Sequence, residues 1–360
     1  MKRPSSAQLV VIESEFELEL GGSLPRLEIA YESWGQPDED MSNCILVIPA
    51  FSANCHARSS DKDLEKGWWE HVIGPGLAID TDRFYVICPS LLGGCHGTTG
   101  PLSENPNDEN KSYQGAFPLV TIGDLARCHL KLLEQLGIEK AYAICGGSMG
   151  AMQVLEMGIH HPACASRIVT ISGTDQTRPA TAAIRHLGRQ AIMLDENFRD
   201  GFYGDLGPEK GIMLARQIGT VFYRSKQEFN DRFPWQPINE PSLNGITFDV
   251  QSYLAHQGGK MVGRFDANAY LRLSMAMDLH DICRNDSQRN WDLESYGAEF
   301  FVGGVEEDRL MPLIEQTELH ELLIANGAKS HLKTFTSPVG HDAFLVKHDG
   351  IDEFIRDSLS

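Results

Sequence analysis

The sequence has few basic residues and no long hydrophobic run. Its 360 residues include 31 Lys and Arg against 50 Asp and Glu, a formal net charge of −19. Such a chain as a whole repels phosphate groups, which argues against nucleic acids and anionic membranes as partners. No apolar run approaches the roughly 20 residues that span a bilayer, and the N-terminal segment has no signal-peptide pattern. We therefore expect a cytoplasmic protein with no membrane and no nucleic-acid partner.

The eight cysteines form no C-x-x-C pair and no Cys/His ligand pattern. Most of them lie within apolar runs such as CILVIPA (44–50) and FYVICPS (84–90), where a thiol packs as a small hydrophobic group. This favours a reducing compartment over a disulfide scaffold, and we expect no metal site. Internal repeats and low-complexity segments are also absent. What is left is a globular chain with 42 % hydrophobic residues, enough for a large core.

An alternation of strands and helices is present instead. Strand-like runs occur at 28–34, 44–50, 84–90, 141–146, 167–173, 299–304 and 331–338. Several are continuously apolar, which is typical of strands buried on both faces of a parallel sheet. The segment 121–138 has leucines at helical spacing, a capping box at Thr121 and Asp124, and Gly137 as its stop. Together these patterns predict a doubly wound, mostly parallel α/β sheet.

Residues 175–294 interrupt the alternation. Their periodicity is mostly helical, apart from the proline-containing stretch 232–245, and strand-like runs return at Glu299. We therefore predict a first part of the core over 1–174, an inserted helical lid over 175–294 and a second part of the core over 295–360.

The stretch CGGSMGAMQ (145–153) places one serine between glycines. It follows an apolar run and precedes a helical pattern, which is the context of a nucleophile elbow, a strained turn that lifts a serine Oγ above the sheet. In this interpretation Ser148 is a nucleophile, and the amide of Met149 donates to an oxyanion. The alternative is a small residue in an ordinary tight turn.

A nucleophilic serine needs a base, and the base needs an acid that orients it. In folds with a nucleophile elbow, these residues follow one another along the chain in the order serine, acid, histidine. Asp308 in VEEDRLMP and His341 in VGHDAFL both lie just beyond predicted strands, so they satisfy this order. We predict Asp308 as the acid and His341 as the base. The alternatives are Glu306 and Glu307 for the acid, and His56 and His96 as other histidines that could line the pocket.

The loop after the early strand 44–50 is a candidate for the second oxyanion donor. In α/β-hydrolases this loop contributes a backbone amide to the oxyanion hole. Phe51 or Ser52 could donate it, and we assign it to Phe51. The other interpretation is an ordinary connection between a strand and a helix.

Several linked stretches resemble the homoserine O-acetyltransferase family, which also includes homoserine O-succinyltransferases and serine O-acyltransferases. They are 67–101, 146–153, 211–216, 250–270 and 339–345. The likeness runs from about Glu28 to the C-terminus. It implies an α/β-hydrolase core with a helical lid, a homodimer, and acyl-CoA as a co-substrate with no further cofactor.

The resemblance also implies roles for individual residues. Ser148, Asp308 and His341 match the nucleophile, the acid and the base. Arg216 in GIMLAR matches the arginine that holds the α-carboxylate of the acceptor, and Asp342 matches the aspartate that holds its α-ammonium group. A guanidinium and a carboxylate beside a serine would suit a free amino acid.

The chain departs from the common homoserine pattern in two places. AFSANCHARSS (50–60) lacks the glycine that usually follows the corresponding His-Ala pair, and ISGTDQTRPATAAIR (171–185) is closer to the serine-acylating branch. We therefore expect the acyl group to pass to L-serine through an acyl-serine enzyme, in cysteine or methionine biosynthesis. The loop residues that we assign to acceptor specificity are Ala53, Asn54, Cys55 and His56.

Two alternatives stay open for the function: a homoserine O-acetyltransferase of methionine biosynthesis, and a serine esterase or thioesterase with water as the acceptor. The acyl group, acetyl or succinyl, is also open, because a succinyl donor carries a second carboxylate that needs another cation in the pocket. The arginines in segments that might reach the pocket are Arg58, Arg178, Arg185 and Arg189.

Overall fold

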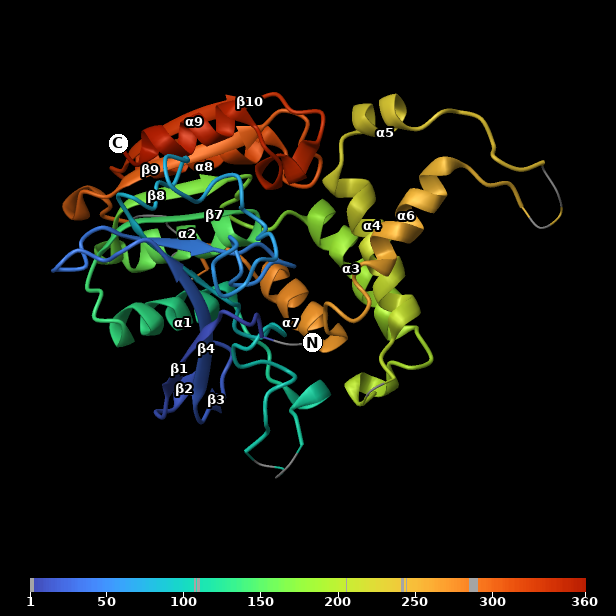
Figure 1. Cartoon of the computed structure of the whole chain (residues 1–360), viewed down its shortest axis with the longest axis horizontal. Coiled ribbons are helices and arrows are strands. Elements are labelled where there is room, and N and C mark those ends of the chain that lie inside the picture. The colour runs from blue at the N-terminus through green and yellow to red at the C-terminus, as the bar shows by residue number, and fades with distance from the viewer. Residues whose placement is uncertain are drawn as a thin grey trace.

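An eight-stranded sheet runs through the molecule in the order β1-β4-β6-β5-β7-β8-β9-β10 (Figure 1). The computed structural model describes residues 3–106, 108, 111–204, 206–240, 243, 245–284 and 291–360. Strands β1 and β4 are antiparallel to their neighbours, and all pairings from β6 to β10 in this order are parallel. The predicted mostly parallel sheet is therefore confirmed.

The strands of this sheet are β1 (Gln8–Ile12), β4 (Leu27–Trp34), β5 (Cys44–Ile48), β6 (Tyr85–Pro89), β7 (Ala141–Gly147), β8 (Ala165–Ile171), β9 (Glu299–Val305) and β10 (Lys329–Phe335). A separate small hairpin pairs β2 (Phe16–Glu17) with β3 (Ser23–Leu24). The helices are α1 (Ile122–Gln135), α2 (Met149–His160), α3 (Pro179–Met193), α4 (Glu209–Tyr223), α5 (Lys226–Arg232), α6 (Asp249–Gly259), α7 (Ala267–Asp278), α8 (Leu313–Ala325) and α9 (Asp349–Ser358).

Apolar clusters cover both faces of the sheet. Along β5, Leu46 and Ile48 belong to one cluster and Ile45 and Val47 to the other, and all four side chains are fully buried. Buried side chains of α1, α2 and α8 complete the first cluster, whereas side chains of α9 complete the second; Figure 1 shows α1 and α9 on opposite sides of the sheet. Burial on both faces explains why the strand sequences are continuously apolar.

Helix α1 begins as the sequence predicts. The Thr121 hydroxyl accepts a hydrogen bond from the amide of Asp124, and the Asp124 carboxylate accepts one from the amide of Thr121. This reciprocal capping box satisfies two amide groups that a helix start otherwise leaves without partners.

The eight cysteines are buried, as expected from their apolar sequence context.

Helices α3 to α6, called the lid helices below, stand to one side of the sheet (Figure 1). Helix α3 packs on α4, and α4 packs on α6. Helix α7 also falls within 175–294, but most of its residues are buried, whereas α5 has no buried residue. The predicted domain boundaries stay a prediction, although α7 packs as part of the core. No helix within the described residues is long and apolar enough to cross a membrane.

Candidate active site

Ser148 occupies the tight turn between β7 and α2. Its backbone has φ +56° and ψ −121°, a conformation that costs energy in a residue with a side chain. A Cβ on Gly150 would lie 2.4 Å from the carbonyl oxygen of Ile48, and a Cβ on Gly146 would lie 2.7 Å from the carbonyl carbon of Gly150. Both glycines are therefore needed for the start of α2 to approach β5 and β7 this closely, and the turn holds Ser148 at the end of the sheet.

A chain of hydrogen bonds joins the three residues predicted to react together. His341 Nε2 lies 2.8 Å from Ser148 Oγ, and His341 Nδ1 lies 2.7 Å from Asp308 Oδ2. Ser148 follows β7, Asp308 follows β9, and His341 follows β10 in the short helical segment Gly340–Leu345. All three side chains are buried. The carboxyl ends of parallel strands thus bring together residues that are up to 193 positions apart in the sequence.

The Asp308 carboxylate is fixed by the backbone that follows it. Its Oδ1 accepts hydrogen bonds from the amides of Leu310 and Met311, at 2.8 Å and 2.9 Å, which leaves Oδ2 directed at His341. The two neighbouring glutamates bind elsewhere. Glu306 contacts the Thr336 hydroxyl, and Glu307 accepts the amide of Ser337. The geometry thus selects Asp308 among the three acidic candidates.

The electrostatics of His341 favour proton uptake. Burial alone would lower the pKa of this imidazole, but the charge and the hydrogen bond of Asp308, together with Asp342 and Glu315, raise its pKa above the ordinary value of 6.5. With Nδ1 protonated and bound to Asp308, Nε2 is free to accept the Ser148 proton. An imidazolium formed in this way would be stabilised by the buried carboxylate.

The two backbone amides predicted to bind an oxyanion belong to Met149 and Phe51. Met149 is the first residue of α2, and Phe51 lines the same pocket as Ser148. Within the described part of the chain, neither amide donates a hydrogen bond, so both are available to a ligand. The Phe51 ring is held edge-on against Tyr270, with ring centroids 4.9 Å apart. The oxyanion roles themselves stay a prediction.

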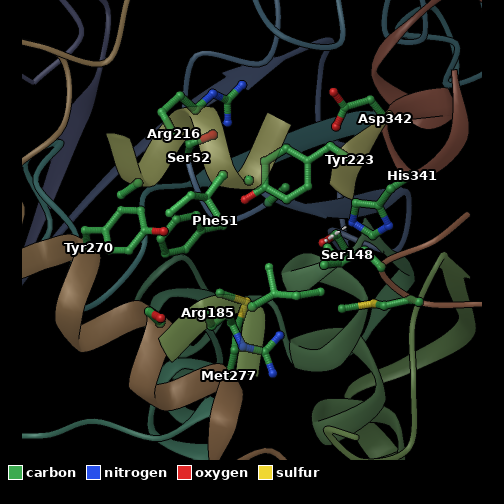
Figure 2. Close-up of a pocket in the computed structure, with 18 of the residues that line it drawn as sticks. Phe51, Ser52, Ser148, Arg185, Arg216, Tyr223, Tyr270, Met277, His341 and Asp342 are labelled. Atoms are coloured by element: carbon green, nitrogen blue, oxygen red, sulfur yellow. Dashed lines mark hydrogen bonds between the residues drawn. The ribbon is translucent and has the colours of Figure 1, made fainter. Parts of the chain in front are cut away.

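The pocket around Ser148 has apolar walls and three charged side chains. Its apolar lining includes Phe51, Ile184, Ala215, Ile218, Met277, Leu310, Met311, Phe344 and Leu345. The charged side chains at its wall besides the His341 imidazole are Arg185, Arg216 and Asp342. Figure 2 shows Arg216 and Asp342 on one side of the Ser148–His341 pair, with Tyr223 between them, and Arg185 on the opposite side.

Arg216 and Asp342 come from different parts of the molecule. Arg216 lies on α4, and its guanidinium carbon is 5.4 Å from the centroid of the Tyr223 ring. Asp342 directly follows His341, and its Oδ2 is 3.1 Å from Nε of Arg224. Arg224 in turn lies 3.3 Å from Glu228. Tyr223 is the last residue of α4 and Arg224 directly follows it, and no sequence motif marks either of them as a site residue.

The four loop residues assigned to acceptor specificity do not line the Ser148 pocket. Ala53, Asn54 and His56 line a neighbouring groove, whereas Cys55 is fully buried. Ser52 and Arg216 line both the groove and the pocket, so the two spaces adjoin there. The predicted specificity loop therefore borders the approach to Ser148 rather than its immediate surroundings.

The alternative histidines also lie along this groove. His56 Nδ1 is 3.0 Å from Oε2 of the buried Glu32, and its Nε2 is 2.7 Å from the backbone oxygen of Glu65. The Glu32 carboxylate raises the pKa of His56 to about 9. Burial lowers the pKa of His96 to about 4. Neither histidine contacts Ser148, whereas His341 does, so the geometry favours His341 among the three; its role as the base stays a prediction.

Of the four arginines considered as ligands for a second carboxylate, Arg185 lines the pocket. Arg58 binds the backbone oxygens of Glu70 and Ile73. Arg178 pairs with the buried Asp175 and the exposed Glu318. Arg189 lies one helical turn beyond Arg185 and binds Ser274 and Asp278.

The α/β-hydrolase fold family matches residues 43–348. Homoserine O-acetyltransferase of Moorella thermoacetica is 38 % identical over 95 % of this chain and 92 % of its own length. The chain belongs to the homoserine O-acetyltransferase family of α/β-hydrolases. Serine O-succinyltransferase of Stenotrophomonas maltophilia, a member named for another acceptor and donor, is also 38 % identical, over 99 % of this chain and 98 % of its own length. The family expected from the sequence motifs is therefore confirmed.

Solved structures agree on the fold and differ in their named activities. Homoserine O-acetyltransferase from Bacillus anthracis superposes with a TM-score of 0.89 at 26 % identity, covering 98 % of this chain and 97 % of that chain. Esterase E22 superposes with a TM-score of 0.88 at 28 % identity, covering 98 % and 100 %. The solved transferase and the solved esterase superpose on this chain almost equally well. The backbone is therefore common to acyl transfer and hydrolysis, and the side chains of the site have to distinguish the two.

Proposed function

We propose that the protein is an amino-acid O-acyltransferase that moves an acyl group from acyl-CoA to the side-chain hydroxyl of L-serine, with L-homoserine as the alternative acceptor. One observation carries the choice of a transferase over an esterase. Arg216 and Asp342 line the same pocket as Ser148 and His341. A guanidinium and a carboxylate are the groups that bind the α-carboxylate and the α-ammonium of a free amino acid, whereas attack by water does not require the pair.

In the first half of the reaction, His341 takes the proton of Ser148 as Oγ attacks the thioester carbonyl. The amides of Met149 and Phe51 donate to the oxyanion of the tetrahedral intermediate. The carbon–sulfur bond then breaks, the CoA sulfur receives the proton held by His341, and CoA leaves. The acyl group remains as an ester on Ser148, and Asp308 stabilises the imidazolium during the step.

In the second half, the acceptor hydroxyl gives its proton to His341 and attacks the acyl ester. The bond between Ser148 Oγ and the acyl carbon breaks, and Oγ recovers the proton from His341. Arg216 and Asp342 hold the acceptor so that its hydroxyl, rather than water, reaches the acyl carbon. The lid helices exclude water from the site, and without this exclusion hydrolysis would compete with transfer.

The groove beside the pocket supports acyl-CoA as the donor. It is lined by Arg3, Lys66, Lys260 and Arg264 as well as Arg216, and by fewer acidic side chains, Asp63 and Glu65. This local excess of positive charge stands against a net charge of −19 for the whole chain. It would attract the phosphates of CoA while the thioester enters past Ser52.

We also propose that the protein works as a homodimer in the cytoplasm, in cysteine or methionine biosynthesis. The lid helices support an assembly because they expose large apolar side chains, among them Leu187 and Leu214. Solvent-exposed leucines of this kind are covered when a second copy packs on them.

Thiol release tests the proposed function directly. Acetyl-CoA and succinyl-CoA are each supplied with L-serine, L-homoserine or no acceptor, to the wild type and to Ser148→Ala. Release that requires an amino acid and is lost in the variant supports the transferase. Release that is indifferent to the acceptor would contradict it and leave a thioesterase. Ser52→Ala is the matched control, because Ser52 lines the pocket without contacting His341.

A further inference from the structure

A second guanidinium lies in the Ser148 pocket, apart from the pair proposed for the amino acid. Arg185 projects from α3, is 8 % exposed, and lines the pocket that contains Ser148. Figure 2 shows Arg185 and Met277 on the side of Ser148 away from Arg216 and Asp342. A zwitterionic acceptor held by Arg216 and Asp342 has no further charge for Arg185 to bind.

The charges around Arg185 do not cancel. Its Nε lies 2.5 Å from Oδ1 of Asp278, and Arg189 lies 2.6 Å from Oδ2 of the same carboxylate. Two guanidinium groups thus share one carboxylate, so the cluster carries one positive charge in excess. A buried charge in excess is costly unless an anion pairs with it.

Arg185 has hydrogen-bonding capacity left for such an anion. Its Nε donates to Asp278, and one terminal nitrogen donates to the Thr177 hydroxyl at 2.9 Å. A guanidinium has five N–H groups in a planar fork, which matches a carboxylate in two-point contact. The two bonds hold the guanidinium in place while its remaining N–H groups are available to a ligand.

The pocket wall adds an apolar path beside this cation. Ile184, Met277, Leu310 and Met311 line the same pocket as Arg185 and Ser148. An acyl group of short methylene chain with a terminal carboxylate has this combination of surfaces. Its methylene groups would contact the apolar side chains while its carboxylate reaches the guanidinium.

We propose that Arg185 binds the terminal carboxylate of a dicarboxylic acyl group, so that the donor is the CoA thioester of a short dicarboxylic acid such as succinate. The assignment rests on the proposed acyltransferase function and adds its donor class. An acetyl group would leave the guanidinium without its partner, and a site built for a charged hydrogen bond disfavours a substrate that lacks the bonding group.

The test measures kcat/KM for succinyl-CoA and acetyl-CoA, with a saturating acceptor, in the wild type, Arg185→Gln and Arg189→Gln. Loss of a hydrogen bond to a charged group lowers the succinyl-CoA value roughly 10- to 100-fold in Arg185→Gln, and the acetyl-CoA value changes much less. Arg189→Gln is the matched control, because it breaks a bond to the same Asp278 without lining the pocket. Arg189→Gln should change kcat/KM for both donors by the same factor, so the ratio of the succinyl-CoA value to the acetyl-CoA value stays that of the wild type.

The outcomes separate the donor assignment from the transferase itself. A wild type that prefers acetyl-CoA would overturn the assignment without any variant. Equal losses with both donors in Arg185→Gln, or a raised KM for the amino acid with each donor, would also overturn it and move Arg185 to a structural or acceptor-binding role. If neither succinyl-CoA nor acetyl-CoA gave thiol release that depends on an amino acid, the proposed acyltransferase function itself would be contradicted. Activity of Arg185→Gln with acetyl-CoA shows that the variant is folded.

Discussion

The sheet and the lid helices contribute different kinds of group to the same pocket. From the ends of the strands come Ser148, Asp308 and His341, which are buried and bound to one another. From the lid helices come Arg185 and Arg216, which face the pocket with charges that small ligands can neutralise. In the proposed function, the sheet therefore carries the bond-making chemistry, and the lid helices select the acyl group and the acceptor.

An ion pair beside the base links the core to the segment that follows α4. Asp342 follows His341 in the core, and it contacts Arg224, which directly follows α4. The proposed ligand of the acceptor's ammonium group is therefore attached to the base on one side and to the lid helices on the other. A shift of α4 would move Arg216 and the partner of Asp342 together.

The largest effect is expected from Asp308→Asn, which alters the core and leaves the lid helices unchanged. An amide cannot stabilise the imidazolium and favours the wrong tautomer of His341, so kcat falls roughly 10³- to 10⁴-fold. The loss should be similar for every donor and acceptor, measured by thiol release. Glu307→Gln is the matched control, because this neighbour binds the Ser337 amide instead of His341. A loss confined to one substrate would contradict the assignment of chemistry to the core.

The next effect tests the lid helices. Arg216→Gln removes the charge proposed to hold the acceptor carboxylate, so kcat/KM for L-serine falls roughly 10- to 100-fold. Acylation of Ser148, followed by mass spectrometry of the protein without an acceptor, should change less because it does not need the amino acid. Arg264→Gln gives the opposite contrast, since Arg264 lines only the groove proposed to bind CoA; its loss should slow the acylation of Ser148 rather than the step that uses the amino acid. Equal losses in both half-reactions would assign Arg216 to CoA binding instead.

The site residues at the strand ends could be predicted from the sequence more fully than those on the lid helices. Ser148, Asp308 and His341 follow predicted strands in a fixed order, so strand ends and chain order are enough to propose them. The lid residues depend on how each helix is rotated about its axis. Arg185 and Arg189 lie four residues apart on α3, yet only the first of them lines the pocket. Sequence periodicity places both on one side of the helix and does not resolve the difference.

The sequence is equally uninformative within the core where the direction of a side chain determines which residue reaches the site. The sequence offered three acidic residues in a row, Glu306, Glu307 and Asp308. Two backbone amides that bind Asp308 Oδ1 turn its other oxygen toward His341. No pattern in the sequence reports where these amides point. Helix α7 is a similar case, since its periodicity allowed a lid helix although its side chains pack in the core.

A smaller effect comes from pH. The pKa of His341 in the free protein is raised above 6.5 by Asp308, Asp342 and Glu315 against the opposing effect of burial. The neutral imidazole is the base, so activity is lost as the pH falls through this raised pKa, about tenfold in kcat/KM per pH unit below it. We expect the acid limb of kcat/KM in the wild type to lie above pH 6.5. Asp342→Asn removes one charge that raises the pKa and should move the limb to lower pH; a limb that moves to higher pH would contradict this electrostatic account.

The smallest effect concerns stability and the loop that borders the pocket. His56 is bound to Glu32 of β4, and this contact raises the His56 pKa from 6.5 to about 9. A raised folded-state pKa means that the pair stabilises the fold fully below pH 6.5 and loses this contribution as the pH rises through about 9. Urea unfolding should therefore show that the stability difference between the wild type and the double variant His56→Gln/Glu32→Gln shrinks from pH 7 to pH 10. Because the double variant leaves no buried charge unpaired, its remaining pH dependence belongs to other groups. A constant difference would mean that His56 is neutral in the folded protein and that the loop is held by its hydrogen bond to the Glu65 carbonyl.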